Sequence, residues 1–450
     1  MVQFSFLDDL VEVTQISTAG LGDHSYIINV GGEGVVIDPQ RDVVRFERQL
    51  ETDNLRLVAV FETHIHNDYL SGGAILAGRA DARYVLPHGT GATVPHVGAQ
   101  DGDDFVIGDA VIQALHTPGH THHHTSYALL VDGTPLAIFS GGSMLVGAVG
   151  RSDLLGPDHT ETLLESQYNS VRRIATDMDD VTLVTPTHGA GSFCAAGTAG
   201  GSVSDIAQEK ISNPALLAPD LATFKTTQLA GYLMYPDYYP TMAPVNRVGA
   251  TPIDESPIPL LPATDRSGRI VDVRPREDFA ACHIVSSTNI PMSTDVGTYT
   301  GWMFENDESY ILVASSDDAE TVRLQFQRIG FDTIIGRIDP SEVTDDLADT
   351  GSYPMATFVE MRTAEGSYKL DVRDPVEVAG GTITGATNIH VATLADNLDG
   401  VPDEPIWTFC ASGYRASIAA SVLAAAGKSP VLVGEQLPDL QAATSTTETI

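Results

Sequence analysis

The feature of this sequence that most restricts its fold is an internal repeat in the second half of the chain. The segment VDVRPREDFAACHIVSSTNIP, which begins at Val271, is echoed by LDVRDPVEVAGGTITGATNIH, which begins at Leu370. The offset between the copies is constant, since 371 − 272 = 99 and 388 − 289 = 99. Each copy continues with an apolar strand, a loop and a helical pattern that ends in glycine, the unit that builds a parallel sheet. Two related domains of about a hundred residues are therefore expected.

The N-terminal half follows a different pattern. Short apolar runs alternate with Gly and Asp turns, and histidines fall where predicted strands give way to loops. Helical patterns at 42–51 and 160–177 indicate an α/β fold. Residues 213–262 are rich in Pro, Tyr and Met without a clear period, which is typical of an ordered connector. We expect three domains and a polar tail, at 1–250, 251–348, 352–440 and 441–450.

The charge balance limits the partners of the chain. It has 60 acidic and 24 basic residues, a net charge of -36, and the acids are scattered among apolar runs, which favours folded domains over a disordered acidic chain. Such a surface repels nucleic acid and anionic membranes, and we interpret it as adaptation to a high-salt cytoplasm. No signal-peptide pattern or membrane-spanning apolar stretch occurs in the sequence, so a cytoplasmic location is expected.

The three cysteines, Cys194, Cys282 and Cys410, are far apart, which argues against a disulfide framework and for reduced thiols. Cys410 ends a predicted strand and opens the loop CASGYR, after which a helix is expected to begin near Ala416. Amides at a helix start, the helix dipole and Arg415 all favour thiolate over thiol. The alternative is a small buried residue at a strand end.

The same loop would cradle a persulfide or an anionic sulfur donor, through four residues that we predict to bind substrate: Ala411, Ser412, Gly413 and Tyr414.

The CASGYR loop, together with LDVRD and GATNIH upstream, resembles the signatures of the rhodanese family over residues 352–440. The resemblance implies that Cys410 carries sulfur as a persulfide. In the first repeat the corresponding strand ends in Ala314, Ser315 and Ser316, and a hydroxyl group does not carry a persulfide. That repeat is expected to be a pseudo-rhodanese that serves docking or spacing, with Cys282 as a packing residue.

Histidines gather at three predicted strand ends. THIHNDYLSG places His64, His66 and Asp68 on one side of an extended turn, HTPGHT brings His120 to a second strand end, and TPTHGAG brings His188 to a third. Imidazoles and carboxylates that converge from several loops are typical of a divalent metal site.

Residues 3–194 resemble the metallo-β-lactamase fold, and ETHIHNDYLSG, HTPGHT, VGRSDLL and HGAGSFC resemble the persulfide dioxygenases that are fused to tandem rhodanese domains. This resemblance implies an N-terminal αββα sandwich followed by two rhodanese-like domains with parallel sheets, and a homo-oligomer. It also implies one ferrous ion per chain, held by two histidines and one aspartate. Zinc and no metal are the alternatives.

By position in that family, the two histidine ligands are His64 and His120, while His66, Asp68 and His188 lie nearby. The position of the aspartate ligand is held by Gly142, so the site lacks its anionic ligand. Its substitutes would be His66 turned inward to give three histidines, a water molecule, or the run His122, His123 and His124, which we expect to be solvated. Tyr69, where many hydrolases of the fold have a histidine, favours a one-metal site.

Three functions remain in view. In the leading hypothesis the N-terminal domain oxidises a low-molecular-weight thiol persulfide with oxygen to sulfite, and Cys410 transfers sulfur to sulfite to give thiosulfate. The second hypothesis keeps only the sulfurtransferase and treats the N-terminal domain as a scaffold. The third is a zinc-dependent thioester hydrolase, which Tyr69 and Gly142 disfavour because both remove ligands of a two-metal site.

Overall fold

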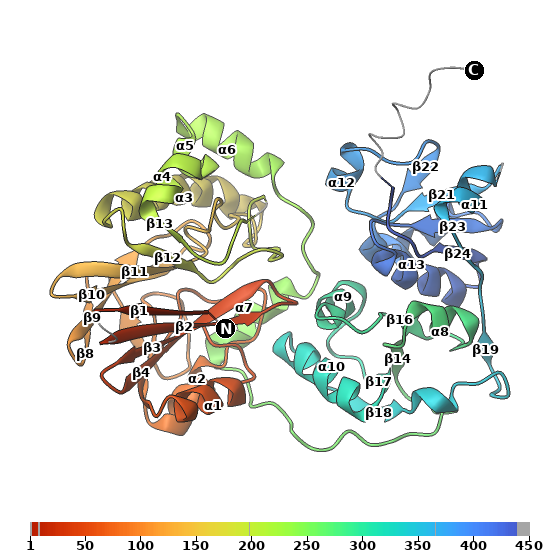
Figure 1. Cartoon of the computed structure of the whole chain (residues 1–450), viewed down its shortest axis with the longest axis horizontal. Helices are drawn as coiled ribbons and strands as arrows, with labels where there is room; N and C mark the ends of the chain where they lie inside the picture. The colour runs from red at the N-terminus through yellow and green to blue at the C-terminus, as the bar shows by residue number, and fades with distance from the viewer. Residues whose placement is uncertain (1, 8–9, 198, 365, 439–450) are drawn as a thin grey trace. The chain divides into compact units, whose positions relative to one another are not determined.

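The computed structural model describes residues 2–7, 10–197, 199–364 and 366–438 (Figure 1), so the tail predicted at 441–450 lies outside the described residues. The chain divides into two compact units at Asp254. The first unit ends there and also takes in Gln327–Gly330, whereas the second holds the rest of residues 255–450. The domain boundaries that the sequence predicts within the second unit, at 348 and 352, stay a prediction.

Two sheets form the centre of the first unit. The strands of one are β1 (Val2–Phe6), β2 (Val11–Thr18), β3 (Asp23–Val30), β4 (Glu33–Ile37), β5 (Arg56–Phe61), β6 (Arg83–Pro87) and β7 (Val97–Ala99). They pair in chain order, antiparallel as far as β4 and parallel beyond it. The strands of the other are β8 (Asp104–Ile107), β9 (Ala110–His116), β10 (Thr125–Val131), β11 (Thr134–Gly141), β12 (Leu183–Pro186) and β13 (Ser204–Asp205), in the order β13-β12-β11-β10-β9-β8.

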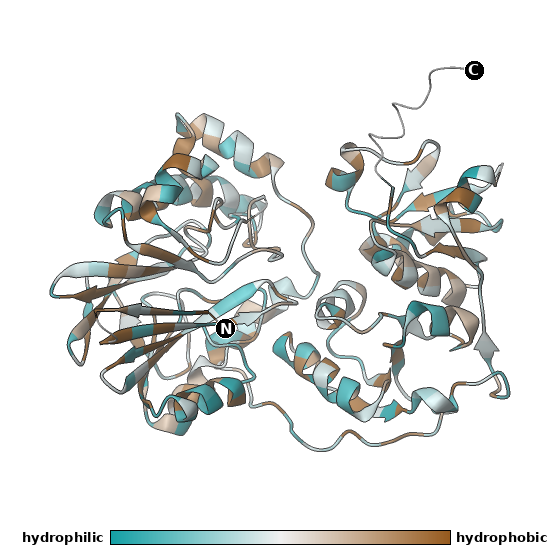
Figure 2. Cartoon of the chain, viewed as in Figure 1, coloured by the Kyte–Doolittle hydropathy of each residue, from teal (hydrophilic) through white to brown (hydrophobic). Residues whose placement is uncertain are grey.

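Alternation along the strands explains why these sheets stack. In β4, Val35 and Ile37 enter the core between the two sheets, whereas Val36 enters the cluster beneath the helices. The inner core also holds Tyr127 and Phe139 from the second sheet, and Figure 2 shows the strands as mainly hydrophobic. A side-chain period of two on strands buried on both faces produces this double core.

Helices cover the outer face of each sheet (Figure 1). Those that pack on the first sheet are α1 (Val44–Thr52), α2 (Gly73–Ala80) and α7 (Tyr239–Val248). Those that pack on the second are α3 (Pro157–Asp177), α4 (Ile206–Ser212), α5 (Pro214–Leu217) and α6 (Leu221–Ala230). The predicted αββα sandwich is confirmed. Helix α3 begins three residues before the predicted start at 160, because Pro157 is suited to the first turn of a helix.

Within the connector predicted at 213–262 lie three helices that the sequence does not predict, α5, α6 and α7. Asn213 caps α5 and Asp220 caps α6, each accepting a backbone N–H. Helix α6 buries only Phe224 and Gln228, four residues apart, so the sequence shows almost no apolar period there.

The second unit holds two parallel sheets, one for each repeat. The first has the order β16-β14-β17-β18, with strands β14 (Arg269–Asp272), β16 (Thr288–Asn289), β17 (Tyr310–Val313) and β18 (Ile334–Ile338). The second has the order β20-β24-β23-β21-β22, with strands β20 (Met355–Ala356), β21 (Tyr368–Asp371), β22 (Ala386–Asn388), β23 (Ile406–Phe409) and β24 (Pro430–Val433). A short antiparallel pair joins β15 (His283–Ile284) to β19 (Thr350–Gly351).

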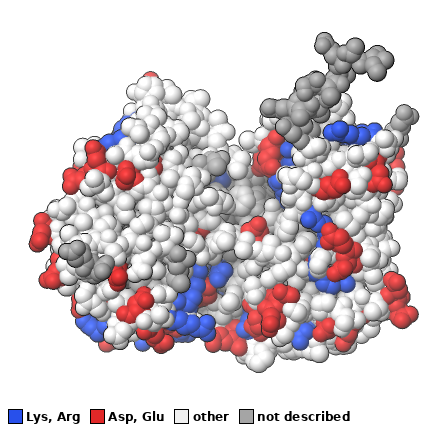
Figure 3. Space-filling model, viewed as in Figure 1, with Lys and Arg blue, Asp and Glu red and all other residues white. Residues whose placement is uncertain are grey.

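The helices of the second unit are α8 (Arg276–Ala281), α9 (Val296–Met303), α10 (Ser316–Arg328), α11 (Phe358–Thr363), α12 (Pro375–Ala379) and α13 (Tyr414–Ala425), with 3-10 turns at Pro340–Glu342, Val391–Thr393 and Ala395–Gly400. Acidic side chains are scattered over the visible face of each unit (Figure 3), as the sequence suggests.

The repeat is retained in hydrogen bonds as well as in sequence. In the first copy the carboxylate of Asp272 accepts from Arg274 at 2.6 Å, and the Asn289 amide donates to the carbonyls of both residues at 3.0 Å. The same ion pair and the same two amide bonds recur 99 residues later, among Asp371, Arg373 and Asn388. Each network ties the first strand of its repeat to the next strand in the sheet.

Strand register shows which residue of the first repeat corresponds to the cysteine. The last residues of β14 and β17 lie opposite each other, and so do the last residues of β21 and β23. The next residue along the chain is Ala314 in the first repeat and Cys410 in the second. Helix α10 begins two residues after Ala314 and has acids in its first turn, which oppose an anion there. The loop after β17 thus lacks both a thiol and a cradle for anionic sulfur.

Candidate metal centre and cysteine site

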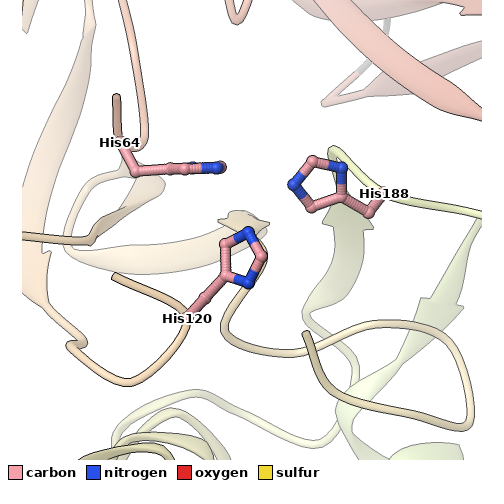
Figure 4. A group of neighbouring side chains, drawn as sticks. All are labelled: His64, His120 and His188. Atoms are coloured by element: carbon pink, nitrogen blue, oxygen red, sulfur yellow. The ribbon is translucent and has the colours of Figure 1, made fainter. Parts of the chain in front are cut away.

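The five residues predicted to bind metal meet at one end of the sandwich. His64, His66 and Asp68 follow β5, His120 lies between β9 and β10, and His188 follows β12. All five side chains are buried. The rings of His64, His120 and His188 point toward one another from three loops (Figure 4).

Three imidazoles offer nitrogen atoms to a common point. Ligand atoms of His64, His120 and His188 lie within 4.8 Å of one another, and the Nε2 atom of each is buried without a hydrogen-bond partner. A buried polar atom without a partner is costly unless something binds it. The geometry therefore fits a metal ion held by three histidines.

The other ring nitrogen of each histidine fixes its tautomer. Nδ1 of His120 donates to the carbonyl of Arg151 at 2.7 Å, and Nδ1 of His188 donates to the carboxylate of Asp23 at 2.9 Å. Nδ1 of His64 lies 2.9 Å from the hydroxyl of Thr63, which gives its own proton to Asp38 and so accepts from the ring. When the ring is neutral, each Nε2 is left with a lone pair, the state that a metal requires.

His66 and Asp68 form a second set beside the first. Nε2 of His66 lies 3.1 Å from Glu62 and 3.2 Å from Asp38, while its Nδ1 and both carboxylate oxygens of Asp68 are buried without hydrogen bonds. Ligand atoms of His66, Asp68 and His188 also lie within 4.8 Å of one another. The third histidine beside His64 and His120 is thus His188. The sequence instead indicates His66 as a substitute ligand.

Tyr69 contacts His66, a member of this second set. Its hydroxyl lies 3.0 Å from Nε2 of His66, and its ring stacks on that imidazole with centroids 4.3 Å apart. The phenol therefore supports His66 at the position where a two-metal hydrolase would place a histidine.

Gly142, at the predicted aspartate position, has no room for a side chain. A Cβ built there would lie 2.4 Å from Cδ2 of His120. The Gly142 amide donates to Nε2 of His124 at 3.0 Å. His124 is fully buried, so the prediction that it is a solvated loop histidine is wrong, because it holds the backbone next to the site. His123 is exposed and His122 half-buried.

Burial sets the protonation of the histidines. It lowers the pKa of His64 well below the usual value and that of His120 to about 3, so both rings are neutral and ready to bind metal. Burial also lowers the pKa of His188, but the negative charge of Asp68 and the hydrogen bond to Asp23 outweigh it and raise that pKa to about 9, so this ring would have to release its Nε2 proton to bind a metal.

Several residues that hydrogen-bond to the candidate metal ligands lie outside any motif, so the sequence alone does not identify them. Asp23 reaches His188 across 165 positions of the chain, and the carbonyl of Arg151 reaches His120 across 31. Asp38 had a signal, because it ends the predicted strand GVVID in a turn, yet that sign is common to many loops. Its carboxylate accepts from the Thr63 amide at 2.7 Å.

Cys410 directly follows β23 and opens the loop that leads into α13. The thiol is only 1% exposed, and its Sγ atom accepts the Ala416 amide at 3.4 Å. The helix begins at Tyr414, two residues before the predicted start, because Gly413 takes the left-handed conformation (φ 82°) just ahead of it.

The other residues of the loop differ in how far they are buried. Ser412 is exposed, Ala411 and Tyr414 are half-buried, and the Ala411 carbonyl accepts from the Leu437 amide at 2.7 Å. Arg415 makes a two-point ion pair with Glu377, in which Nη2 lies 2.9 Å from Oε1. The guanidinium predicted to favour the thiolate is therefore partly neutralised by its own repeat.

Comparison with known families assigns the candidate metal centre and the cysteine site to two different domain families. The metallo-beta-lactamase superfamily model matches residues 20–188, and the rhodanese-like domain model matches residues 356–435. The first range holds the five residues predicted to bind metal, and the second holds Cys410. The chain is a fusion of a metallo-beta-lactamase domain and a rhodanese-like domain.

Two curated relatives illustrate what the fusion is similar to. A hydroxyacylglutathione hydrolase of Tolumonas auensis is 30% identical over 170 residues, which cover 37% of the fusion and 61% of the hydrolase. A mitochondrial persulfide dioxygenase of Bos taurus is 27% identical over 191 residues, which cover 41% of the fusion and 66% of the relative. The fusion thus spans less than two thirds of the length of each.

A solved structure extends the likeness beyond that part. The crystal structure titled as a metallo-beta-lactamase from Staphylococcus aureus subsp. aureus COL is 28% identical, with a TM-score of 0.68, and covers 73% of the fusion and 99% of its own chain. Among the described residues of the fusion, no helix has the length and apolar character needed to cross a membrane.

Proposed function

We propose that the fusion is an enzyme of sulfur metabolism whose rhodanese-like domain transfers sulfane sulfur through Cys410. The observation that carries the proposal is the hydrogen bond from the Ala416 amide to Cys410 Sγ at the start of α13. An amide and a helix N-terminus both stabilise negative charge on sulfur, which favours the nucleophilic thiolate.

The transfer is a pair of displacements at sulfur. The Cys410 thiolate attacks the sulfane sulfur of thiosulfate, the S–S bond of thiosulfate breaks, and sulfite leaves with the electron pair. Cyanide then attacks the terminal sulfur of the Cys410 persulfide, which gives thiocyanate and restores the thiolate. With sulfite as the acceptor, the same persulfide yields thiosulfate.

A second activity is favoured by the unpartnered donor atoms of the metallo-beta-lactamase domain. His64, His120 and His188 would hold one ferrous ion, with zinc as the alternative, while Thr63, Arg151 and Asp23 orient their rings. A bound ferrous ion would bring dioxygen and a thiol persulfide together. The balanced reaction converts thiol persulfide, dioxygen and water into thiol, sulfite and two protons. The persulfide dioxygenase relative supports this substrate class.

The two activities form a sequence when a second thiol persulfide transfers its outer sulfur to the Cys410 thiolate and leaves as thiolate, because sulfite from the first reaction is then the acceptor for the Cys410 persulfide and gives thiosulfate. The scaffold hypothesis does not account for the buried Nε2 atoms of His64, His120 and His188, none of which has a hydrogen-bond partner. The hydrolase hypothesis has support from the hydrolase relative, and Tyr69 in place of a histidine weighs against it.

Separate assays of the two domains test the proposal. Cys410→Ser is expected to abolish thiocyanate formation from thiosulfate and cyanide, whereas Cys282→Ser is expected to retain it. Iron-loaded protein is expected to consume oxygen with a thiol persulfide in wild type and Cys410→Ser alike, and the variant is expected to accumulate the sulfite that wild type converts to thiosulfate. Thioester hydrolysis by zinc-loaded protein without oxygen uptake would favour the hydrolase instead.

A further inference from the structure

The loop that follows Cys410 is held from outside its own repeat. Nη1 of Arg276, at the start of α8 in the first repeat, donates to the carbonyl of Ser412 at 2.9 Å. A Cβ built on the neighbouring Gly413 would lie 2.0 Å from the same nitrogen. The guanidinium therefore packs directly on the loop, and only glycine at 413 leaves it that space.

A second contact of the first repeat reaches the first residue of α13. The Tyr414 hydroxyl donates to the carbonyl of Pro291 at 3.0 Å and lies 2.8 Å from the hydroxyl of Ser293. The Tyr414 ring lies against that of Tyr299, with centroids 5.2 Å apart. The helix that begins beside the cysteine is thus fixed at its first turn by the cysteine-less repeat.

A third contact extends along α13. The hydroxyl of Ser417 donates to the side-chain carbonyl of Asn289, and the backbone N–H of Asn289 donates to the hydroxyl of Ser421 at 3.0 Å. All three side chains are buried. Because Asn289 also holds the Asp272 network of its own repeat, α13 is bound to the framework of the first repeat rather than to a surface loop.

Charge distinguishes Arg276 from Arg415, the cation supplied by the loop itself. Arg415 is bound at two points by Glu377. Arg276 lies 3.4 Å from Glu277, whose side chain is 62% exposed, whereas that of Arg276 is 27% exposed. An ion pair with a largely solvated partner is weak, so Arg276 leaves more of its positive charge for an anion at the loop.

We infer that Arg276 is a positioning residue of the Cys410 site, which fixes the loop and draws anionic sulfur substrates such as thiosulfate and sulfite to it. The cysteine-less repeat then forms one side of the Cys410 site and contributes a charged residue to it, in addition to any role in docking or spacing. This inference rests on the proposed sulfurtransferase function.

Kinetics of full-length variants test this role. Arg276→Ala is expected to raise the KM for thiosulfate about tenfold, because a charge-assisted contact is lost, with a smaller change in kcat. Arg276→Lys should recover most of the affinity, since it keeps the charge. Arg269→Ala, which removes an exposed ion pair with Glu308 in the same repeat, is the matched control and should leave KM unchanged.

Alkylation of Cys410 gives a readout that does not require sulfur transfer. The ratio of its rates with anionic iodoacetate and neutral iodoacetamide is expected to fall several-fold in Arg276→Ala and to recover in Arg276→Lys, because the ratio reports positive charge near the thiol. An unchanged ratio together with a KM within twofold of wild type would overturn the inference. Wild-type protein that shows the charge effect without any sulfur transfer would instead refute the proposed function.

Discussion

Gly142 lies against the imidazole of His120, and a Cβ added at this glycine would approach the ring to 2.4 Å. The space that an aspartate ligand would need in this chain is therefore occupied by one of the histidines that offers its nitrogen to the metal. The missing carboxylate and the three-histidine set are two aspects of one arrangement.

The first prediction concerns substitution of this glycine. Gly142→Ala and Gly142→Asp are both expected to lower the free energy of unfolding by about 1–3 kcal/mol, because the added atoms force His120 to move. Both should also reduce bound metal, measured per chain after anaerobic loading. Gly78→Ala is the control, since a Cβ there meets open space in α2. Greater iron content and faster oxygen uptake in Gly142→Asp would show instead that the natural site is impaired.

A second prediction concerns the metal ligands. His64→Ala, His120→Ala and His188→Ala are each expected to weaken metal binding by at least about tenfold, because each removes one of three nitrogen donors. Elemental analysis of anaerobically purified protein measures this loss. His123→Ala changes an exposed histidine nearby and should bind metal as wild type does. Retention of full metal content in His188→Ala would remove that residue from the set.

The third prediction uses the two copies of the repeat network. Asn388→Ala is expected to lower the free energy of unfolding by about 1–3 kcal/mol, because two buried carbonyls lose their donor. Asn289→Ala should cost more, since it also leaves the Ser417 hydroxyl without its acceptor. Urea unfolding monitored by circular dichroism measures both. Equal losses in the two variants would show that the contact with α13 contributes little.

The sequence predicts the layers of the fold well because each depends on local pattern. The α/β class of the first unit follows from apolar runs broken by Gly and Asp, and the two parallel sheets follow from the 99-residue offset, whereas the αββα sandwich is implied by the resemblance to the metallo-β-lactamase fold. The helices within 213–262 escape prediction because α6 buries only two residues, which leaves no apolar period. Local pattern thus fails where a helix contributes little to the core.

In the candidate site, too, some residues can be predicted from the sequence and others cannot. The residues predicted to bind metal lie together because strand ends of one sandwich meet at the same edge. Their supporting partners depend on contacts that no spacing reveals, such as that of Asp23 with His188. The sequence likewise shows that Gly142 lacks a carboxylate, but only the packing shows that His120 fills the space. Arg276 beside Ser412 is hidden for a similar reason, since 136 residues separate them.

The central claim is that Cys410 carries sulfane sulfur, and intact-protein mass spectrometry after incubation with thiosulfate tests it most directly. Wild-type protein is expected to gain the mass of one sulfur atom, to lose it on addition of cyanide, and to place it on the peptide that contains Cys410. The Cys410→Ser variant should gain none, while Cys194→Ser and Cys282→Ser should behave as wild type. An unmodified wild-type protein, or added sulfur on Cys194 or Cys282 instead, would contradict the account.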